Sequence, residues 1–152
     1  MLDPAQCRVY GEWAETMKRS PKTRARNRII KQLDDLARQA CFERDGHVCV
    51  RCGKGNVQWC HILSRRHKCT RWELDNVLSM DAGCHRFWHS YPTLSGESFR
   101  RNWPDRHERI TALYNKGGKV DLAAKLAELK ELALPPATPR VPGRIKDSSI
   151  PF

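Results

Sequence analysis

The sequence predicts a small α+β domain in which two short strands and a helix form one unit, flanked on both sides by further helices. A dense group of cysteines, histidines and one asparagine lies between residues 49 and 89, and apolar residues recur at helical spacing on either side of it. Only 39% of the 152 residues are hydrophobic and 30% are charged, so the core must be small. A structural metal is one device that stabilises such a core.

The chain divides into three predicted parts. Residues 1–31 form a basic N-terminal arm with a short helix, residues 32–134 form the folded domain with its C-terminal helices, and residues 135–152 form a proline-rich flexible tail. Residues 18–31 carry seven Lys or Arg and no acid, and we expect Pro21 to interrupt any helix there.

Periodicity and stop signals predict the elements in order. A helix over residues 27–44 has its apolar residues three or four positions apart and ends at Asp45-Gly46. The other predicted elements are strand 57–63, basic loop 64–75, strand 76–80, helix 82–91 ended by Pro92, a helix from Pro104 to about residue 115, and a helix capped by Asp121 that runs to about residue 134.

Net charge and cysteine content indicate which kinds of partner and ligand the protein binds. The formal net charge is +11, from 28 Lys and Arg against 17 Asp and Glu, and the cations are clustered. This clustering favours a polyanion such as DNA over the alternative of a soluble basic protein with no nucleic-acid role. No apolar run is long enough for a membrane span or a signal peptide, so we expect a cytoplasmic protein whose cysteines bind metal.

The cysteines predict a structural zinc site. Cys49-x2-Cys52 has the form of a zinc knuckle, in which two thiolates lie on a tight glycine-containing turn, and Cys84 supplies a third thiolate. Three residues compete for the fourth position: Asp81, Cys60 and Cys69. The alternative is a set of buried cysteines that bind no metal.

The histidines suggest a second, hydrolytic site. The four-residue step from His85 to His89 places both rings on one helix face, where they can share a divalent ion. His61, on a strand, could take a proton from water, and Asn76 could hold the His61 ring through a hydrogen bond. Each residue alone also fits a structural or surface role; their order along the chain favours the hydrolytic interpretation.

Cations near these residues are candidates for phosphate contact. We predict nucleic-acid binding by the loop residues Arg65, Arg66, Lys68 and Arg71 and by the arm residues Arg24, Arg26 and Arg28. A solvated loop and arm are the alternative. Trp59, Trp72 and Trp88 could stack on unpaired bases, but their strand and helix positions favour core packing.

These motifs carry a family resemblance. Residues 41–91 resemble the HNH (ββα-metal) endonucleases in their zinc-knuckle form, and residues 33–92 are similar to phage recombination nucleases of the NinG/Rap type. The segments that carry the likeness are Leu33-Asp34-Asp35, Ser64-Arg65-Arg66, Thr70-Arg71-Trp72, Asp75-Asn76 and Ala82-Gly83-Cys84-His85.

The resemblance implies DNA cleavage with His61 as general base, Asn76 as its orienting residue, and His85 and His89 as ligands of a catalytic Mg²⁺, Mn²⁺ or Zn²⁺ ion. Cys60 stands where the family often has an acidic or histidine ligand, and a thiolate favours a softer ion. The narrower likeness implies branched substrates such as Holliday junctions, and the host cytoplasm if the gene is phage-encoded.

Two rival functions remain at this stage: a non-catalytic zinc-binding DNA adaptor, and an accessory factor for phage DNA packaging that acts with a phage protein partner. A homodimer would suit a two-fold junction, and the apolar stripe over residues 122–132 is a candidate interface. DNA versus RNA, and a nick versus a double-strand cut, stay open.

Overall fold

The computed structural model describes residues 20–132. The predicted short helix in residues 1–17 and the proline-rich tail lie outside this range. The elements, in chain order, are α2 (Pro21–Arg44), β1 (Gln58–His61), α3 (Lys68–Arg71), the 3-10 helix η1 (Leu74–Asn76), β2 (Val77–Met80), α4 (Ala82–Ser90), α5 (Pro92–Asn102), α6 (Pro104–Lys116) and α7 (Leu122–Leu132). This mixture of helices with a small sheet confirms the predicted α+β class.

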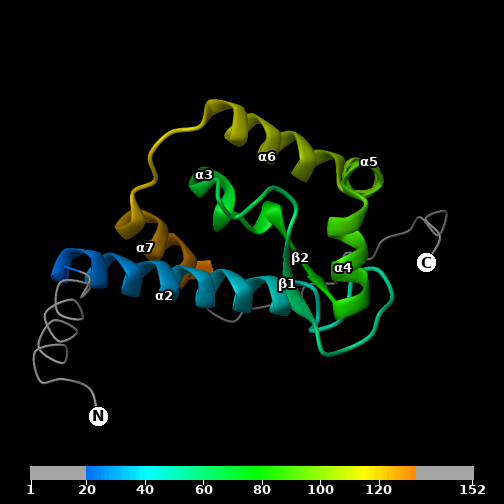
Figure 1. Ribbon diagram of the computed structural model, residues 1–152, viewed down its shortest axis with the longest axis horizontal. Coiled ribbons are helices and arrows are strands. Elements are labelled where there is room, and N and C mark those ends of the chain that lie inside the picture. Colours follow the sequence, from blue (N-terminus) through cyan, green and yellow to red (C-terminus); the bar gives the residue numbers. More distant parts are fainter. Residues whose placement is uncertain (1–19, 133–152) are drawn as a thin grey trace, which may run out of the picture.

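The sheet has two antiparallel strands, β1 and β2, which pair Cys60 with Leu78 and His61 with Val77. Every residue of β2 is buried, and α4 follows it directly after Asp81. Figure 1 shows α2 along one side with α7 against it, α6 on the opposite side, and the sheet, α3 and η1 between them. None of the helices in the described range is long and apolar enough to cross a membrane.

Two clusters of apolar side chains form the core. The first surrounds the sheet and α4, and contains Cys49, Val50, Cys60, Leu78, Met80, Cys84, Trp88, Phe99 and Ile110. The second joins α2 to α7 and contains Leu33, Ala37, Trp72 and Leu129, with Leu122 and Leu126 packed against it. Trp72 and Trp88 are 1% and 6% exposed, which agrees with the predicted core packing. Leu122, Leu126 and Leu129 of the α7 stripe, a candidate dimer interface, pack in this cluster against α2 within the same chain, and Leu132 is exposed.

The expectation that Pro21 interrupts a helix is wrong, because α2 begins at this residue. Proline suits the first turn, where its missing N–H has no helical partner, and the Ser20 hydroxyl accepts a hydrogen bond from the Thr23 N–H at 3.2 Å. Residues 21–31 of the basic segment are therefore the N-terminal part of a 24-residue helix, and the predicted boundary between residues 31 and 32 falls inside that helix.

Two further segments are more helical than predicted. The loop expected over residues 64–75 contains α3 and part of η1. Pro92 ends α4, as expected, but it also occupies the first turn of α5, which was not predicted. α5 connects α4 to α6 and contributes the fully buried Phe99 to the core.

Candidate metal centres and histidine cleft

The first candidate metal centre joins the turn after α2 to the start of α4. Ligand atoms of Cys49, Cys52, Asp81 and Cys84 all lie within 4.8 Å of one another. The turn is closed by hydrogen bonds from the Cys49 N–H to the Lys54 carbonyl and from the Gly53 N–H to the Cys49 carbonyl, both at 2.8 Å. Gly53 has a φ of 76°, a left-handed conformation that glycine adopts without strain.

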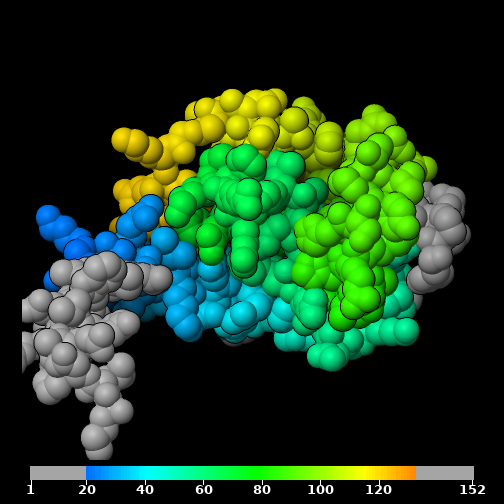
Figure 2. Space-filling model, viewed as in Figure 1, coloured from blue at the N-terminus to red at the C-terminus, as the bar shows by residue number. Residues whose placement is uncertain are grey.

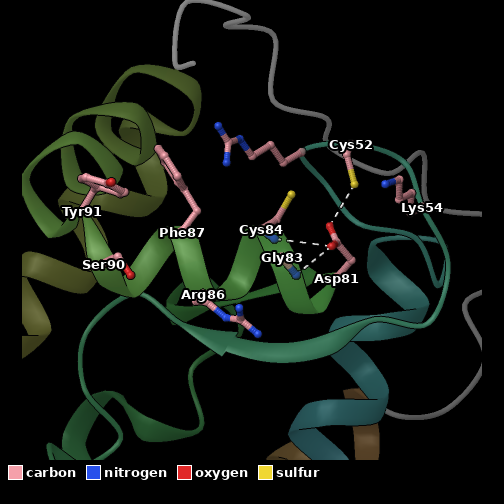
Figure 3. A pocket seen from close by; sticks show the side chains of 10 residues that line it. Cys52, Lys54, Asp81, Gly83, Cys84, Arg86, Phe87, Ser90 and Tyr91 are labelled. Atoms are coloured by element: carbon pink, nitrogen blue, oxygen red, sulfur yellow. Dashed lines mark hydrogen bonds between the residues drawn. The ribbon is translucent and has the colours of Figure 1, made fainter. Parts of the chain in front are cut away.

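Asp81 is oriented toward the cysteines by its position as N-cap of α4. Its Oδ1 accepts hydrogen bonds from the N–H groups of Gly83 and Cys84, at 2.9 and 3.4 Å. Its Oδ2 accepts a hydrogen bond from the Cys52 thiol at 2.9 Å, as Figure 3 shows. Hydrogen bonds from the Cys52 and Cys84 thiols hold the pKa of this carboxyl well below its usual range. The carboxylate therefore carries its charge where a cation would be bound.

This donor set is compatible with a structural zinc. Tetrahedral Zn²⁺ takes sulfur at about 2.3 Å and carboxylate oxygen at about 2.0–2.2 Å, so four donors already within 4.8 Å of one another need only small shifts. Of the three candidates for the fourth ligand, Asp81 lies with the three cysteines. Cys60 belongs to a different group, and Cys69 lies in neither.

The second candidate centre contains Cys60, His85 and His89, whose ligand atoms also lie within 4.8 Å of one another. The two histidine Nε2 atoms are 3.1 Å apart. His85 Nδ1 lies 2.7 Å from the Gln58 side-chain oxygen, which can only accept, so Nδ1 carries the proton and Nε2 is left as a lone-pair donor. Burial raises the pKa of the Cys60 thiol, so a cation would have to displace its proton.

His61 lines the same cleft as the two histidines of this second group. The cleft has a volume of about 550 Å³, and its lining includes His61, His85, His89 and Arg65. The Arg71 carbonyl lies 3.1 Å from His61 Nε2 and can only accept, so Nε2 carries the proton and Nδ1 has the free lone pair. Burial lowers the pKa of His61 to about 4, which keeps the ring neutral near pH 7. A neutral histidine with a fixed tautomer can serve as a proton acceptor.

The side chain of Arg71 is engaged within the protein. Its Nε and one terminal nitrogen donate to the two carboxylate oxygens of Asp34 at 2.9 and 2.6 Å, and Trp72 Nε1 donates to the same carboxylate at 2.7 Å. Arg71 thus has a structural role in addition to its predicted phosphate contact, which stays a prediction. The ion pair between Asp34 and Arg71 joins α3 to α2, and so it fixes the position of the Arg71 carbonyl that accepts from His61.

Asn76 is fully buried and acts on the backbone rather than on the His61 ring. Its Oδ1 accepts from the Leu63 N–H at 2.7 Å, and its Nδ2 donates to the carbonyls of Leu63 and Thr70 at 3.0 and 2.9 Å. The expected hydrogen bond to His61 is thus wrong, because these three bonds use both amide hydrogens and the oxygen. Asn76 closes the segment that runs from the end of β1 to α3.

The other predicted cations are exposed to solvent. Arg65, Arg66 and Lys68 are exposed, as are Arg24, Arg26 and Arg28 on α2. Burial, followed by the positive charges of Arg26 and Arg71, lowers the pKa of Lys68, which places α3 close to the basic half of α2. Figure 2 shows the two segments side by side.

Gln58 and Asp34 were missed by the sequence analysis. Gln58 could have been found, because it stands two residues before Cys60 and so shares its strand face. Asp34 could not, because only the packing of α2 on α3 reveals its partner. No protein-family model, curated protein or solved structure matches this chain.

Proposed function

We propose that this protein is a metal-dependent DNA endonuclease of the HNH type that hydrolyses phosphodiester bonds. The observation that carries the proposal is the histidine cleft, in which a neutral His61 with its Nδ1 lone pair free lies beside the paired His85 and His89. Hydrolysis needs these two functions together, a proton acceptor for water and a position for a cation.

In the proposed reaction, His61 Nδ1 accepts a proton from a water molecule as the water oxygen forms a bond to phosphorus. The bond from phosphorus to the leaving oxygen breaks, and that oxygen is protonated by solvent. His85 and His89, with Cys60 as a third ligand, would hold a divalent cation, which when bound would stabilise the negative charge that develops in the reaction. Arg65, which lines the cleft, neutralises a phosphate of the bound strand.

The surface charge supports a nucleic-acid substrate. Exposed cations lie on the N-terminal part of α2 and on the segment before α3, whose Arg65 lines the cleft, and each phosphate contact there would release counterions. The Cys49–Cys52–Asp81–Cys84 group has a separate role, since it joins the turn after α2 to α4, which carries His85 and His89. Branched junctions remain the narrower part of the proposal, because they rest on the family resemblance alone.

The test is cleavage of supercoiled plasmid and of a synthetic four-way junction with Mg²⁺, Mn²⁺ or Zn²⁺. We expect wild type to cut and His61→Ala to lose at least about a hundredfold in rate, the usual size of a general-base contribution. His47→Asn is the matched control, because His47 has a φ of 57°, which asparagine tolerates, and lies outside the cleft.

Two results would redirect the proposal. Cutting that survives in His61→Ala would remove the general-base assignment. DNA binding without cutting under any of the three ions would favour the zinc-binding adaptor, for which the basic surface and the cysteine group suffice, or a packaging factor that needs its partner.

A further inference from the structure

A second hollow lies beside the histidine cleft, between α4, α5 and α6, and we call it the side pocket. Its volume is about 220 Å³, and Trp88, Phe99 and Ile110 are among the residues that line it. Ile62 and His89 line both the side pocket and the histidine cleft, so the two spaces meet at these side chains. Anything held by the histidine cleft is thus a neighbour of the side pocket.

Two polar side chains of α6, His107 and Thr111, also line the side pocket. Both are half-buried, and within residues 20–132 neither the His107 ring nitrogens nor the Thr111 hydroxyl has a hydrogen-bond partner in the protein. A mainly apolar hollow with a few convergent polar groups is the usual form of a site for a small ring-shaped ligand.

Gly96 of α5 leaves one wall of the side pocket without a side chain. A Cβ atom built at this position meets no other atom within 4 Å. Glycine inside a helix is unfavourable relative to alanine, so nothing in the local helix geometry calls for it here. Gly96 is exposed, so a larger side chain at this position has open space beside the side pocket into which it can extend.

We propose that the side pocket receives one unpaired nucleobase of the strand whose phosphate lies in the histidine cleft. This inference rests on the proposed nuclease function and deepens it, since it makes a strand with unpaired nucleotides the preferred substrate. An apolar cavity of about 150 Å³ holds a benzene molecule, so a larger space of about 220 Å³ has room for a nucleobase ring.

The chemistry of the walls matches this occupant. Trp88 and the half-buried His107 contribute aromatic rings of the kind on which bases stack, and the fully buried Phe99 lies behind His107 with ring centroids 6.3 Å apart. His107 and Thr111 can also bond to polar atoms on the base edge. A base within a duplex has its edge paired and its faces stacked, so it would first have to leave the helix at a cost in free energy. An unpaired base has no such cost.

The experiment compares wild type with Gly96→Phe, which adds a large side chain to the lining of the side pocket, and with Gly96→Ala, which adds a single methyl group. Each full-length protein is mixed, with no catalytic ion added, with short single strands that carry the fluorescent base 2-aminopurine at successive positions. We expect wild type and Gly96→Ala to change the fluorescence strongly at one position. Gly96→Phe should abolish that change and weaken strand binding roughly tenfold, the size of one lost stacking contact.

Three controls separate the outcomes. Thermal unfolding should show Gly96→Phe to be at least as stable as wild type, since the new side chain meets open space in a helix. Thr111→Val, which keeps the shape and removes the hydroxyl, should change which base is preferred but leave the affinity for a strand with an abasic site unchanged. Duplex binding should be the same in all the variants.

The inference is overturned if no position responds in wild type, or if Gly96→Phe responds as wild type does. If wild type cuts DNA and Gly96→Phe gives the same fluorescence response as wild type, the side pocket does not bind a base. The proposed nuclease function is then unaffected. A wild type that binds neither single strands nor duplex overturns the proposed function itself, so the two failures are distinguishable.

Discussion

At the scale of single residues, the properties of the histidine cleft depend on side chains that do not line it. The Arg71 carbonyl decides which nitrogen of His61 carries the proton, and Asp34 fixes Arg71 through two hydrogen bonds. Gln58 does the same for His85 through its side-chain oxygen. Tautomers set in this way leave a lone pair on His61 Nδ1 and one on His85 Nε2, which faces His89 Nε2 at 3.1 Å.

Asp34→Asn should lower the free energy of unfolding by about 1.5–3 kcal/mol, because the two hydrogen bonds with Arg71 lose their charged partner and one of them is lost. Asp35→Asn is the neighbouring control. Its carboxylate pairs with Lys31 and Arg38 on the exposed face of α2, so we expect a much smaller loss. Urea denaturation of both variants measures the difference, and equal losses would show that the link from α2 to α3 contributes little.

The thiol of Cys41 should be unreactive in the folded protein. Burial raises its pKa to about 12, and its sulfur lies 3.7 Å from both Asp45 Oδ2 and the Ser79 hydroxyl. Because the thiolate is the reactive form, iodoacetamide at mildly alkaline pH should label the half-buried Cys69 and leave Cys41 unmodified until denaturant is added. Peptide mass spectrometry reads the sites, and rapid labelling of Cys41 would show that α2 opens locally.

At the scale of elements, the attachment of α7 combines apolar packing with one nearly buried ion-pair group. Leu129 is fully buried against α2, and Lys125 Nζ lies 2.7 Å from Glu73 and 2.8 Å from Glu128. Burial by itself lowers the pKa of Lys125, but the two carboxylates outweigh it and the pKa is raised. Lys125 therefore joins α7 to the segment before η1 in its charged form.

Lys125→Met should destabilise the protein by about 1 kcal/mol at neutral pH. A lysine with a raised pKa contributes stability that is fully present below the unfolded pKa of about 10.4 and is lost as the pH rises through the folded value. The difference between variant and wild type should therefore shrink in strongly alkaline solution. Urea titrations at neutral and alkaline pH measure it, and a difference independent of pH would assign the loss to packing alone.

The sequence predicted those elements whose signals are local. α4, α6 and α7 have caps or breakers at their ends, and the predicted bounds lie close to those in the structure. α5 was missed because proline both stops one helix and starts the next, and the sequence does not distinguish the two uses at Pro92. The four-residue spacing of His85 and His89 is also a local signal, so it could be predicted. The Asp34–Arg71 pair joins residues 37 positions apart and depends on how α2 packs, so the sequence could not predict it.

At the scale of the whole molecule, the two candidate metal centres belong to one core. Cys49 and Cys84 of the first and Cys60 of the second all lie in the apolar cluster around the sheet. Binding of a structural zinc by a small domain contributes directly to folding, with apparent free energies of about 10–16 kcal/mol in zinc-finger peptides. The stability of the histidine cleft should therefore depend on the cysteine group.

Cys52→Ser should remove one zinc per chain and lower the melting temperature by about 10 °C or more. Cys69→Ser is the matched control, since Cys69 lies outside both groups, and it should retain the metal. His85→Ala should also retain this zinc, because its ring belongs to the second group. Elemental analysis and calorimetry give both quantities. Unchanged zinc in Cys52→Ser would show that the cysteine group does not hold the metal.

The distribution of charge over the molecule gives the last prediction. Arg24 and Arg28 are exposed one turn apart on the basic half of α2, whereas Lys116 and Lys130 are exposed at the ends of α6 and α7. The double variants Arg24→Glu with Arg28→Glu and Lys116→Glu with Lys130→Glu change the net charge equally. If α2 contacts two phosphates, the first variant should flatten the slope of log affinity for duplex DNA against log salt by about 2, and the second should barely change it.

Fluorescence anisotropy over a salt series measures both slopes. If both double variants change the salt slope equally, DNA binding depends only on the net charge of the protein, and α2 does not contact the DNA.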